Sequence, residues 1–153
     1  MSNRLRRLFL LAACVSAASA RADGSAGALQ AGSYSVDSVL ELPHLEGQGA
    51  KKTATICVVE AGACATRGLV VLSENNPLRK CPASNARQDG STLTFDIKCD
   101  GLNAAMGKAK YDLAGDHFTA TIDMKMGGKN MTMMEMQRGH RIGDCESAPQ
   151  PRS

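Results

Sequence analysis

The sequence predicts a single all-β domain of seven or eight short antiparallel strands, stapled by disulfides and folded as a curved sheet, a sandwich or a small barrel. Several short runs alternate apolar and polar residues with a period of two, Gly-rich breaks separate these runs, and no segment has a sustained helical period. The length of 153 residues fits one domain better than two.

The clearest alternation lies at residues 93–99, Leu-Thr-Phe-Asp-Ile-Lys-Cys, where every second residue is apolar. Such a strand covers a core with one face only. Asp89-Gly90, just before it, is a strong signal for a hairpin turn. Counting back along the partner strand places Cys81 opposite or next to Cys99, so we expect these two cysteines to be bonded.

A second hairpin is predicted around Gly115-Asp116, between runs at residues 108–113 and 117–124. A one-residue slip would set Leu113 against His117 and lose the match of the two apolar faces, so the register is well specified. A two-residue turn pairs the apolar residues as Leu113 with Phe118, Tyr111 with Ala120 and Ala109 with Ile122.

Further β-rich runs complete the predicted domain, which covers residues 32–145. They lie at residues 33–43, 53–59 and 69–72. Gly, Ala, Ser and Pro are frequent in residues 23–31 and 146–153, which we expect to be a loose N-terminal segment and a disordered tail.

Residues 1–22 have the features of a signal peptide. Three arginines precede an apolar run at residues 8–18, and the small residues that follow fit cleavage after Ala20 or Ala22. The apolar run is about half the roughly 20 residues that a membrane-spanning helix needs. We therefore expect a periplasmic or secreted protein with no membrane span. The alternative is a lipid-anchored form, because Leu-Ala-Ala-Cys14 resembles the acylation motif of lipoproteins.

Composition argues against nucleic acid and anionic membranes as partners. Four of the 18 basic residues lie in the signal peptide, which leaves 14 basic against 15 acidic residues in the rest of the chain. A near-neutral chain lacks the electrostatic attraction that phosphate-rich surfaces require. Aromatic residues make up 3% of the chain and Trp is absent, so stacking platforms for single-stranded nucleic acid are hard to assemble.

The cysteines are expected to form structural disulfides rather than a metal site or a redox site. Of the six present, Cys14 lies in the signal peptide, which leaves an odd number in an oxidising compartment. Two disulfides and one spare thiol are expected. No Cys-x-x-Cys motif occurs and the three histidines are scattered, so neither a zinc site nor a thioredoxin-like redox site is supported.

The order and spacing of several segments resemble the domain of unknown function 3617 family, whose members are small exported bacterial proteins. The resemblance covers about residues 29–145 and implies a location in the cell envelope, a β-rich fold and no established activity. The segments that carry it are Leu29-Gln-Ala-Gly-Ser-Tyr34, Thr55-Ile-Cys57, the interval from Cys81 to Cys99, Tyr111-x-x-x-Gly115-Asp116 and the ending Arg141-Ile-Gly-Asp-Cys145.

The resemblance also implies a second disulfide, between Cys57 and Cys145. Four cysteines match the family pattern, and Cys64 is this chain's addition. Cys64 remains a competitor of Cys57 for Cys145, because its surroundings have a loop-like composition. Tyr34 stands where the family often has Trp, and this change preserves an amphipathic aromatic residue.

The strongest oddity of composition is a methionine-rich segment at residues 124–136, which holds six of the eight methionines. The side chains could fill a core that is short of aromatic residues, line an adaptable groove for an apolar ligand or protein partner, or bind Cu(I), which prefers soft sulfur ligands. The adjacent Met133 and Met134 break the alternation, which predicts methionines on both faces or a bulge. The candidate Cu(I) ligands are Met131, Met133, Met134 and Met136.

No motif for catalysis or for a cofactor is present: there is no nucleophile elbow, phosphate loop or dinucleotide fingerprint. His117 falls on the polar face of its predicted strand, where a solvated side chain is expected. We therefore expect a non-catalytic binding module of the cell envelope, with no catalytic residue and no cofactor other than Cu(I). The alternative is an accessory structural envelope protein whose methionines only pack the core.

Overall fold

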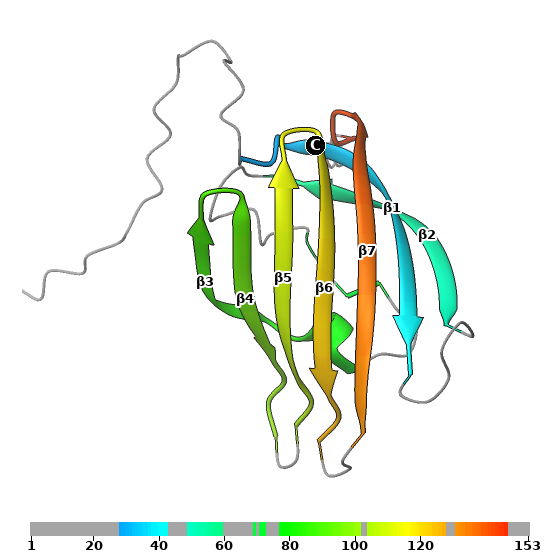
Figure 1. Cartoon of the computed structure of the whole chain (residues 1–153), viewed down its shortest axis with the longest axis vertical. Coiled ribbons are helices and arrows are strands. Elements are labelled where there is room, and N and C mark those ends of the chain that lie inside the picture. Colours follow the sequence, from blue (N-terminus) through cyan, green and yellow to red (C-terminus); the bar gives the residue numbers. More distant parts are fainter. Residues whose placement is uncertain are drawn as a thin grey trace, which may run out of the picture.

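The computed structural model describes residues 28–42, 49–59, 69, 71–72, 77–101, 104–127 and 131–146. The predicted signal peptide, His44, Cys64 and residues 147–153 of the predicted tail lie outside these residues. Within them, seven antiparallel strands form one sheet in the order β2-β1-β7-β6-β5-β4-β3 (Figure 1). The elements are β1 (Gly32–Glu41), β2 (Ala50–Val58), the short 3-10 helix η2 (Pro77–Lys80), β3 (Ala83–Asp89), β4 (Thr92–Lys98), β5 (Met106–Ala114), β6 (His117–Lys125) and β7 (Thr132–Gly143).

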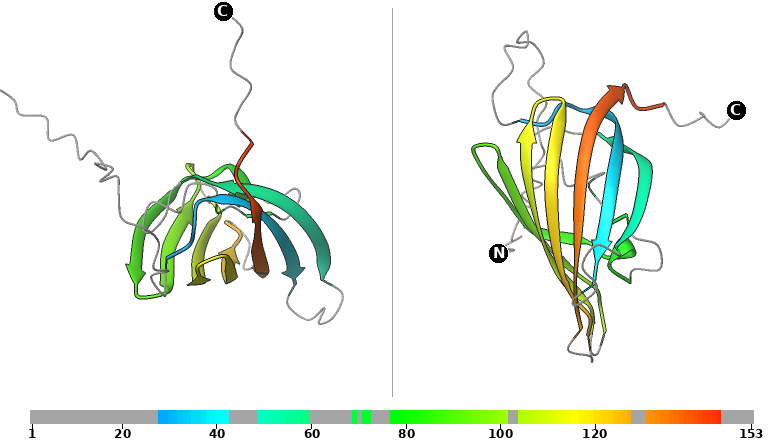
Figure 2. Two further views of the ribbon diagram at one scale, coloured as in Figure 1. Left: turned by 90° about the horizontal axis from the view of Figure 1, so that it is seen from above. Right: turned by 45° about the vertical axis from the view of Figure 1, so that its right-hand side comes forward.

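The predicted all-β class is confirmed, and of the three expected architectures the chain adopts the curved sheet. Seen from above, the sheet is an arch (Figure 2). The side chains on its concave face form the core, and η2 lies behind β6 and β7 in Figure 1, on that face. Leu69, Val71 and Leu72 are also buried in this core but lie outside any strand. The strand expected at residues 69–72 is therefore wrong, because these apolar residues cover the sheet instead of joining it.

The pairing of β5 with β6 matches the predicted register, including Leu113 opposite Phe118. The β3–β4 hairpin is also confirmed, although its turn is one residue later than expected, since Asp89 pairs with Thr92. Packing begins with Leu29, which is fully buried and forms a bridge with Gly115, before the predicted domain start at residue 32.

Four aromatic rings form a chain across the concave face. Tyr34 and Phe118 have ring centroids 5.8 Å apart, Phe118 and Tyr111 5.3 Å, and Tyr111 and Phe95 5.6 Å. Apart from Phe9, these are all the aromatic residues of the chain. Because aromatic pairs stabilise beyond the area that they bury, this chain of rings links β1 to β4 through β5 and β6.

Gly139 makes that contact possible. It lies on β7 between β1 and β6, opposite both Val36 and Phe118. A Cβ atom at Gly139 would overlap the ring of Phe118. The glycine therefore lets the ring of Phe118 lie over β7 and reach Tyr34 on the next strand.

We predict that Gly139→Ala lowers the free energy of unfolding by about 1–3 kcal/mol, the usual cost of overpacking a core. Phe118→Leu removes the ring atoms that the new methyl group would meet, so the two substitutions together should cost less than the sum of the single costs. Urea unfolding of the four proteins measures both quantities. Additive costs would contradict the proposed contact.

Candidate functional site

A buried polar network crosses the concave face of the sheet. Glu135 and Gln137 on β7 point into the core and are almost completely inaccessible. The Gln137 side chain donates a hydrogen bond of 2.6 Å to Oε1 of Glu135, and the hydroxyl of Tyr111 donates one of 3.1 Å to Oε1 of Gln137. The backbone N–H of Leu72 donates to the same Glu135 oxygen at 2.8 Å.

This network attaches Leu72, one of the buried residues that cover the concave face, to the sheet. Leu72 belongs to no strand, so its N–H has no ladder partner, and the carboxyl group of Glu135 supplies the acceptor. A buried polar group without a partner would cost about 1–3 kcal/mol. The network therefore has a structural role, and it offers no open site for a ligand.

Burial, reinforced by the negative charge of Glu135, raises the pKa of Tyr111 far above its ordinary value of 10.0. Burial also raises the pKa of Tyr34, although the positive charge of Arg141 opposes this shift. Both rings are therefore held in the neutral form in the folded protein.

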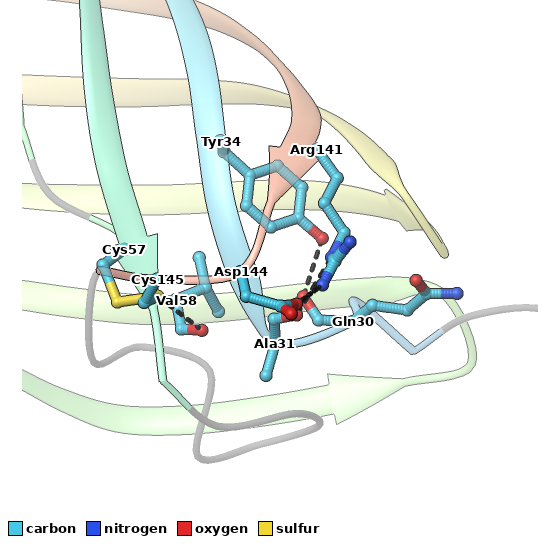
Figure 3. Close-up of a disulfide and its surroundings, with 8 residues drawn as sticks. All are labelled: Gln30, Ala31, Tyr34, Cys57, Val58, Arg141, Asp144 and Cys145. Carbon is cyan, nitrogen blue, oxygen red and sulfur yellow. Dashed lines mark hydrogen bonds and ion pairs between the residues drawn. A yellow bond between two sulfur atoms is a disulfide. The ribbon is translucent and has the colours of Figure 1, made fainter. Parts of the chain in front are cut away.

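A second polar cluster connects the residues just before β1 to Tyr34 on β1 and Arg141 on β7 (Figure 3). The Tyr34 hydroxyl donates to the carbonyl oxygen of Gln30 at 2.7 Å, and Nε of Arg141 donates to the carbonyl oxygen of Ala31 at 3.0 Å. The Arg141 guanidinium also pairs with Asp144. Gly32 has a φ of +150°, and a side chain there would overlap Arg141.

Both predicted disulfides are present. Cys57 is bonded to Cys145, with Cα atoms 5.5 Å apart, and Cys81 is bonded to Cys99, with Cα atoms 4.9 Å apart. The first joins β2 to the end of β7, the two strands that flank β1 (Figure 3). Closing the loop between Cys57 and Cys145 stabilises the fold by on the order of 4–5 kcal/mol in the chain-entropy model.

The methionines divide between the two faces of the sheet. The pairing of β6 with β7 is continuous, so Met133 and Met134 point to opposite faces and no bulge lies between them. Met133 packs against the core beside the buried Met124, whereas Met134 and Met136 lie on the convex outer face. The four candidate Cu(I) ligands therefore do not lie together: Met131 and Met133 have one parity, and Met134 and Met136 have the other.

A groove of about 770 Å³ crosses the outer face at the end of the sheet where β7 begins; we call it the outer groove. Two rows of outward-pointing residues line it, two positions apart along each strand, which corresponds to about 7 Å. Strand pairing places the members of each row side by side. The first row contains Glu41, Met134, Asp123, Lys108 and Asp96, and the second contains Thr132, Lys125, Met106 and Lys98.

The two rows differ in charge. The first row has three carboxylates and one ammonium group, and the second has two ammonium groups and no acid. Each row has a methionine between charged neighbours: Met134 in the first and Met106, which is 49% exposed, in the second. The outer groove therefore has one methionine in each row, flanked by charged residues, and its two rows carry opposite net charge.

The remaining candidates do not converge on a site. His117 is exposed as expected, and its Nδ1 lies 2.8 Å from Oδ1 of Asp116. This hydrogen bond lowers the pKa of Asp116. Within the described residues, no three His, Cys, Asp or Glu side chains are placed to hold a metal ion. None of the helices in this part of the chain is long and apolar enough to cross a membrane.

The family model for the protein of unknown function DUF3617 matches residues 29–145. The chain belongs to the DUF3617 family. Searches of curated proteins and of solved structures give no match. In this DUF3617 protein, the matched region begins at the buried Leu29 and ends at the disulfide-bonded Cys145, so it coincides with the packed sheet.

Neither the buried network of Glu135 and Gln137 nor the outer groove of this DUF3617 protein was predicted from the sequence. Glu135 and Gln137 alternate in phase with the half-buried Met133 and the buried Gly139, and this phase is the one signal in the sequence for their burial. The outer groove is built from residues on six strands that only sheet pairing brings together.

The raised tyrosine pKa values predict a loss of stability at alkaline pH. Because the folded-state pKa values exceed those of the unfolded chain, this contribution is fully present below about pH 10 and is lost as the pH rises towards the folded-state values. The slope should reach about 1.4 kcal/mol per pH unit for each tyrosine that ionises on unfolding, and Tyr111→Phe should make it shallower. Tyrosinate absorbance reports the titration cleanly, because the chain has two tyrosines and no Trp. Ionisation of Tyr111 near pH 10 in the folded protein would contradict this prediction.

Proposed function

We propose that this DUF3617 protein is a non-catalytic binding module of the bacterial envelope, and that its outer groove holds an extended, mainly apolar segment of a partner protein. The observation that carries the proposal is the outer groove itself, with a methionine between charged neighbours in each of its two rows. Flexible, polarizable thioethers suit a surface that adapts to different apolar side chains.

The charges of the outer groove favour a polypeptide over a purely apolar molecule. A hydrocarbon chain would leave Glu41, Asp123 and Lys125 without a role. A peptide segment with basic residues along one side and acidic residues along the other would complement the two rows of the outer groove. Such charge pairing gives specificity and orientation. Binding of a free apolar molecule is the competing outcome.

The second candidate is an accessory structural protein. The full burial of Met124 and the packing of Met126 and Met133 against the core favour it. In contrast, Met106 and Met136 are exposed at 49% and 37%, so core packing does not account for every methionine. The absence of catalytic motifs in the sequence supports a non-enzymatic role for either candidate.

We predict that Met106→Glu and Met134→Glu each weaken the binding of an anilinonaphthalene sulfonate dye by about tenfold, equivalent to about 1.4 kcal/mol. Met136→Glu is the matched control, because it adds the same charge to the same face outside the outer groove. Fluorescence titration measures dye affinity, and melting curves confirm that the variants are folded. Equal effects at Met106 and Met136, or no dye binding by the wild type, would contradict the proposed site.

For the location, we propose export to the periplasm with cleavage after Ala20 or Ala22. Two disulfides are typical of proteins outside the cytoplasm. The intact mass of the protein recovered from its own cell envelope should match one of the two cleaved forms. The mass of a diacylated chain beginning at Cys14 would instead indicate the lipid-anchored form, and an uncleaved chain would contradict export.

A further inference from the structure

The β6–β7 hairpin brings four thioethers to one face of the sheet. Met124 on β6 is directly opposite Met133 on β7. The N–H of Met126 donates a hydrogen bond of 2.9 Å to the carbonyl oxygen of Met131, so the same pairing continues two residues further and sets these two methionines opposite each other. We call these four residues the thioether cluster.

From this arrangement we propose that the thioether cluster is a binding site for Cu(I). Opposite residues on paired strands have Cβ atoms about 4.5–5.5 Å apart, and neighbours of the same parity are separated by about 7 Å along the strand. Four flexible side chains that start this close can direct their sulfur atoms to one ion. Soft thioether sulfur selects Cu(I) over the harder divalent cations.

The position of the thioether cluster suits capture of an ion better than packing alone. Met124 is 2% exposed and seals the inner end, Met126 and Met133 are half-buried, and Met131 is 42% exposed. Accessibility therefore increases towards the end of the hairpin. There the strands β4 to β7 converge and extend past β1 and β2 (Figure 1). An ion can reach the outer thioethers while the inner ones provide a water-poor environment.

The charge of the surroundings also fits a monovalent cation. All four ligands are neutral, so the bound ion would keep its positive charge. Glu135 lies on the same inner face, two residues beyond Met133 on β7. A buried carboxyl group two residues along the strand from Met133 favours a nearby cation more strongly than it would in water, because the local dielectric constant is low.

Met124 and Met133 of the thioether cluster also border the outer groove, whereas Met126 and Met131 do not, so substitutions at Met126 and Met131 test the copper site separately from the groove. Met134 and Met136 point away from the thioether cluster and provide a matched control. The test compares Met126→Leu/Met131→Leu with Met134→Leu/Met136→Leu, each of which removes two thioethers and keeps the side-chain volume. All proteins carry Cys64→Ser and intact disulfides, so that no free thiol competes for copper.

Cu(I) is titrated without oxygen against a chromophoric Cu(I) chelator, with ascorbate as the reductant. The wild type should take up one Cu(I) per chain, the inner-face variant should bind at least about tenfold more weakly, and the outer-face variant should match the wild type. X-ray absorption of the copper-loaded protein should show only sulfur in the first coordination shell. No uptake by the wild type, equal losses in both variants, or nitrogen and oxygen ligands would overturn the proposal.

Ag(I), a soft ion that does not change oxidation state here, gives a second readout that does not depend on affinity. In a protein labelled at the methionine methyl groups, Ag(I) should shift the signals of the thioether cluster and leave those of Met134 and Met136 in place. Shifts confined to Met134 and Met136 would move the site to the outer face and overturn the assignment.

Discussion

The contact between Phe118 and Gly139 connects the packing of the aromatic core to the register of β6 and β7. Because the ring of Phe118 occupies the space that a side chain at position 139 would need, the contact favours the register of β6 and β7 in which Gly139 lies opposite Phe118. A one-residue slip would replace Gly139 opposite Phe118 by a long polar side chain. The same register decides which methionines face the core and which face solvent, since the period of a strand is two. The contact between Phe118 and Gly139 therefore also decides which methionines of β6 and β7 face the core.

The concave face also has to be covered, because a single curved sheet leaves its apolar side open to water. The covering residues Leu69, Val71, Leu72 and Leu78 lie between Cys57 and Cys81, which are both disulfide-bonded. Between these covalent anchors, the Leu72 N–H bonds to Glu135. The carboxyl group is thus placed in an apolar core for a defined reason: it satisfies a backbone group that belongs to no strand. With the core closed in this way, the two proposed binding sites lie on the convex face and at the open end of the β6–β7 hairpin.

The local features of this fold could be predicted from the sequence, and the long-range ones could not. Alternation and a two-residue turn determine the pairing of Leu113 with Phe118, and the hairpin register brings Cys81 to Cys99, because these contacts are close in the sequence. The apolar residues 69–72 resemble a strand locally, and only their position over the sheet shows that they are cover instead. Density along the chain predicts Met131, Met133, Met134 and Met136 as Cu(I) ligands, whereas cross-strand pairing brings together Met124, Met126, Met131 and Met133. Similarly, the outer groove joins Glu41 of β1 to Asp96 of β4, a proximity that depends on the order of the strands.

Both proposed binding sites depend on the division of the methionines between the two faces of the sheet, and contacts between methionine methyl groups measure this division. A nuclear Overhauser experiment on methyl-labelled protein, with each signal assigned by single Met→Leu substitutions, reports which methyl groups lie within a few ångströms of each other. The β6–β7 register predicts cross-peaks between Met124 and Met133 and between Met126 and Met131, with none from Met124 to Met134. A cross-peak between Met124 and Met134, with none to Met133, would show that β7 is shifted by one residue and would contradict the account.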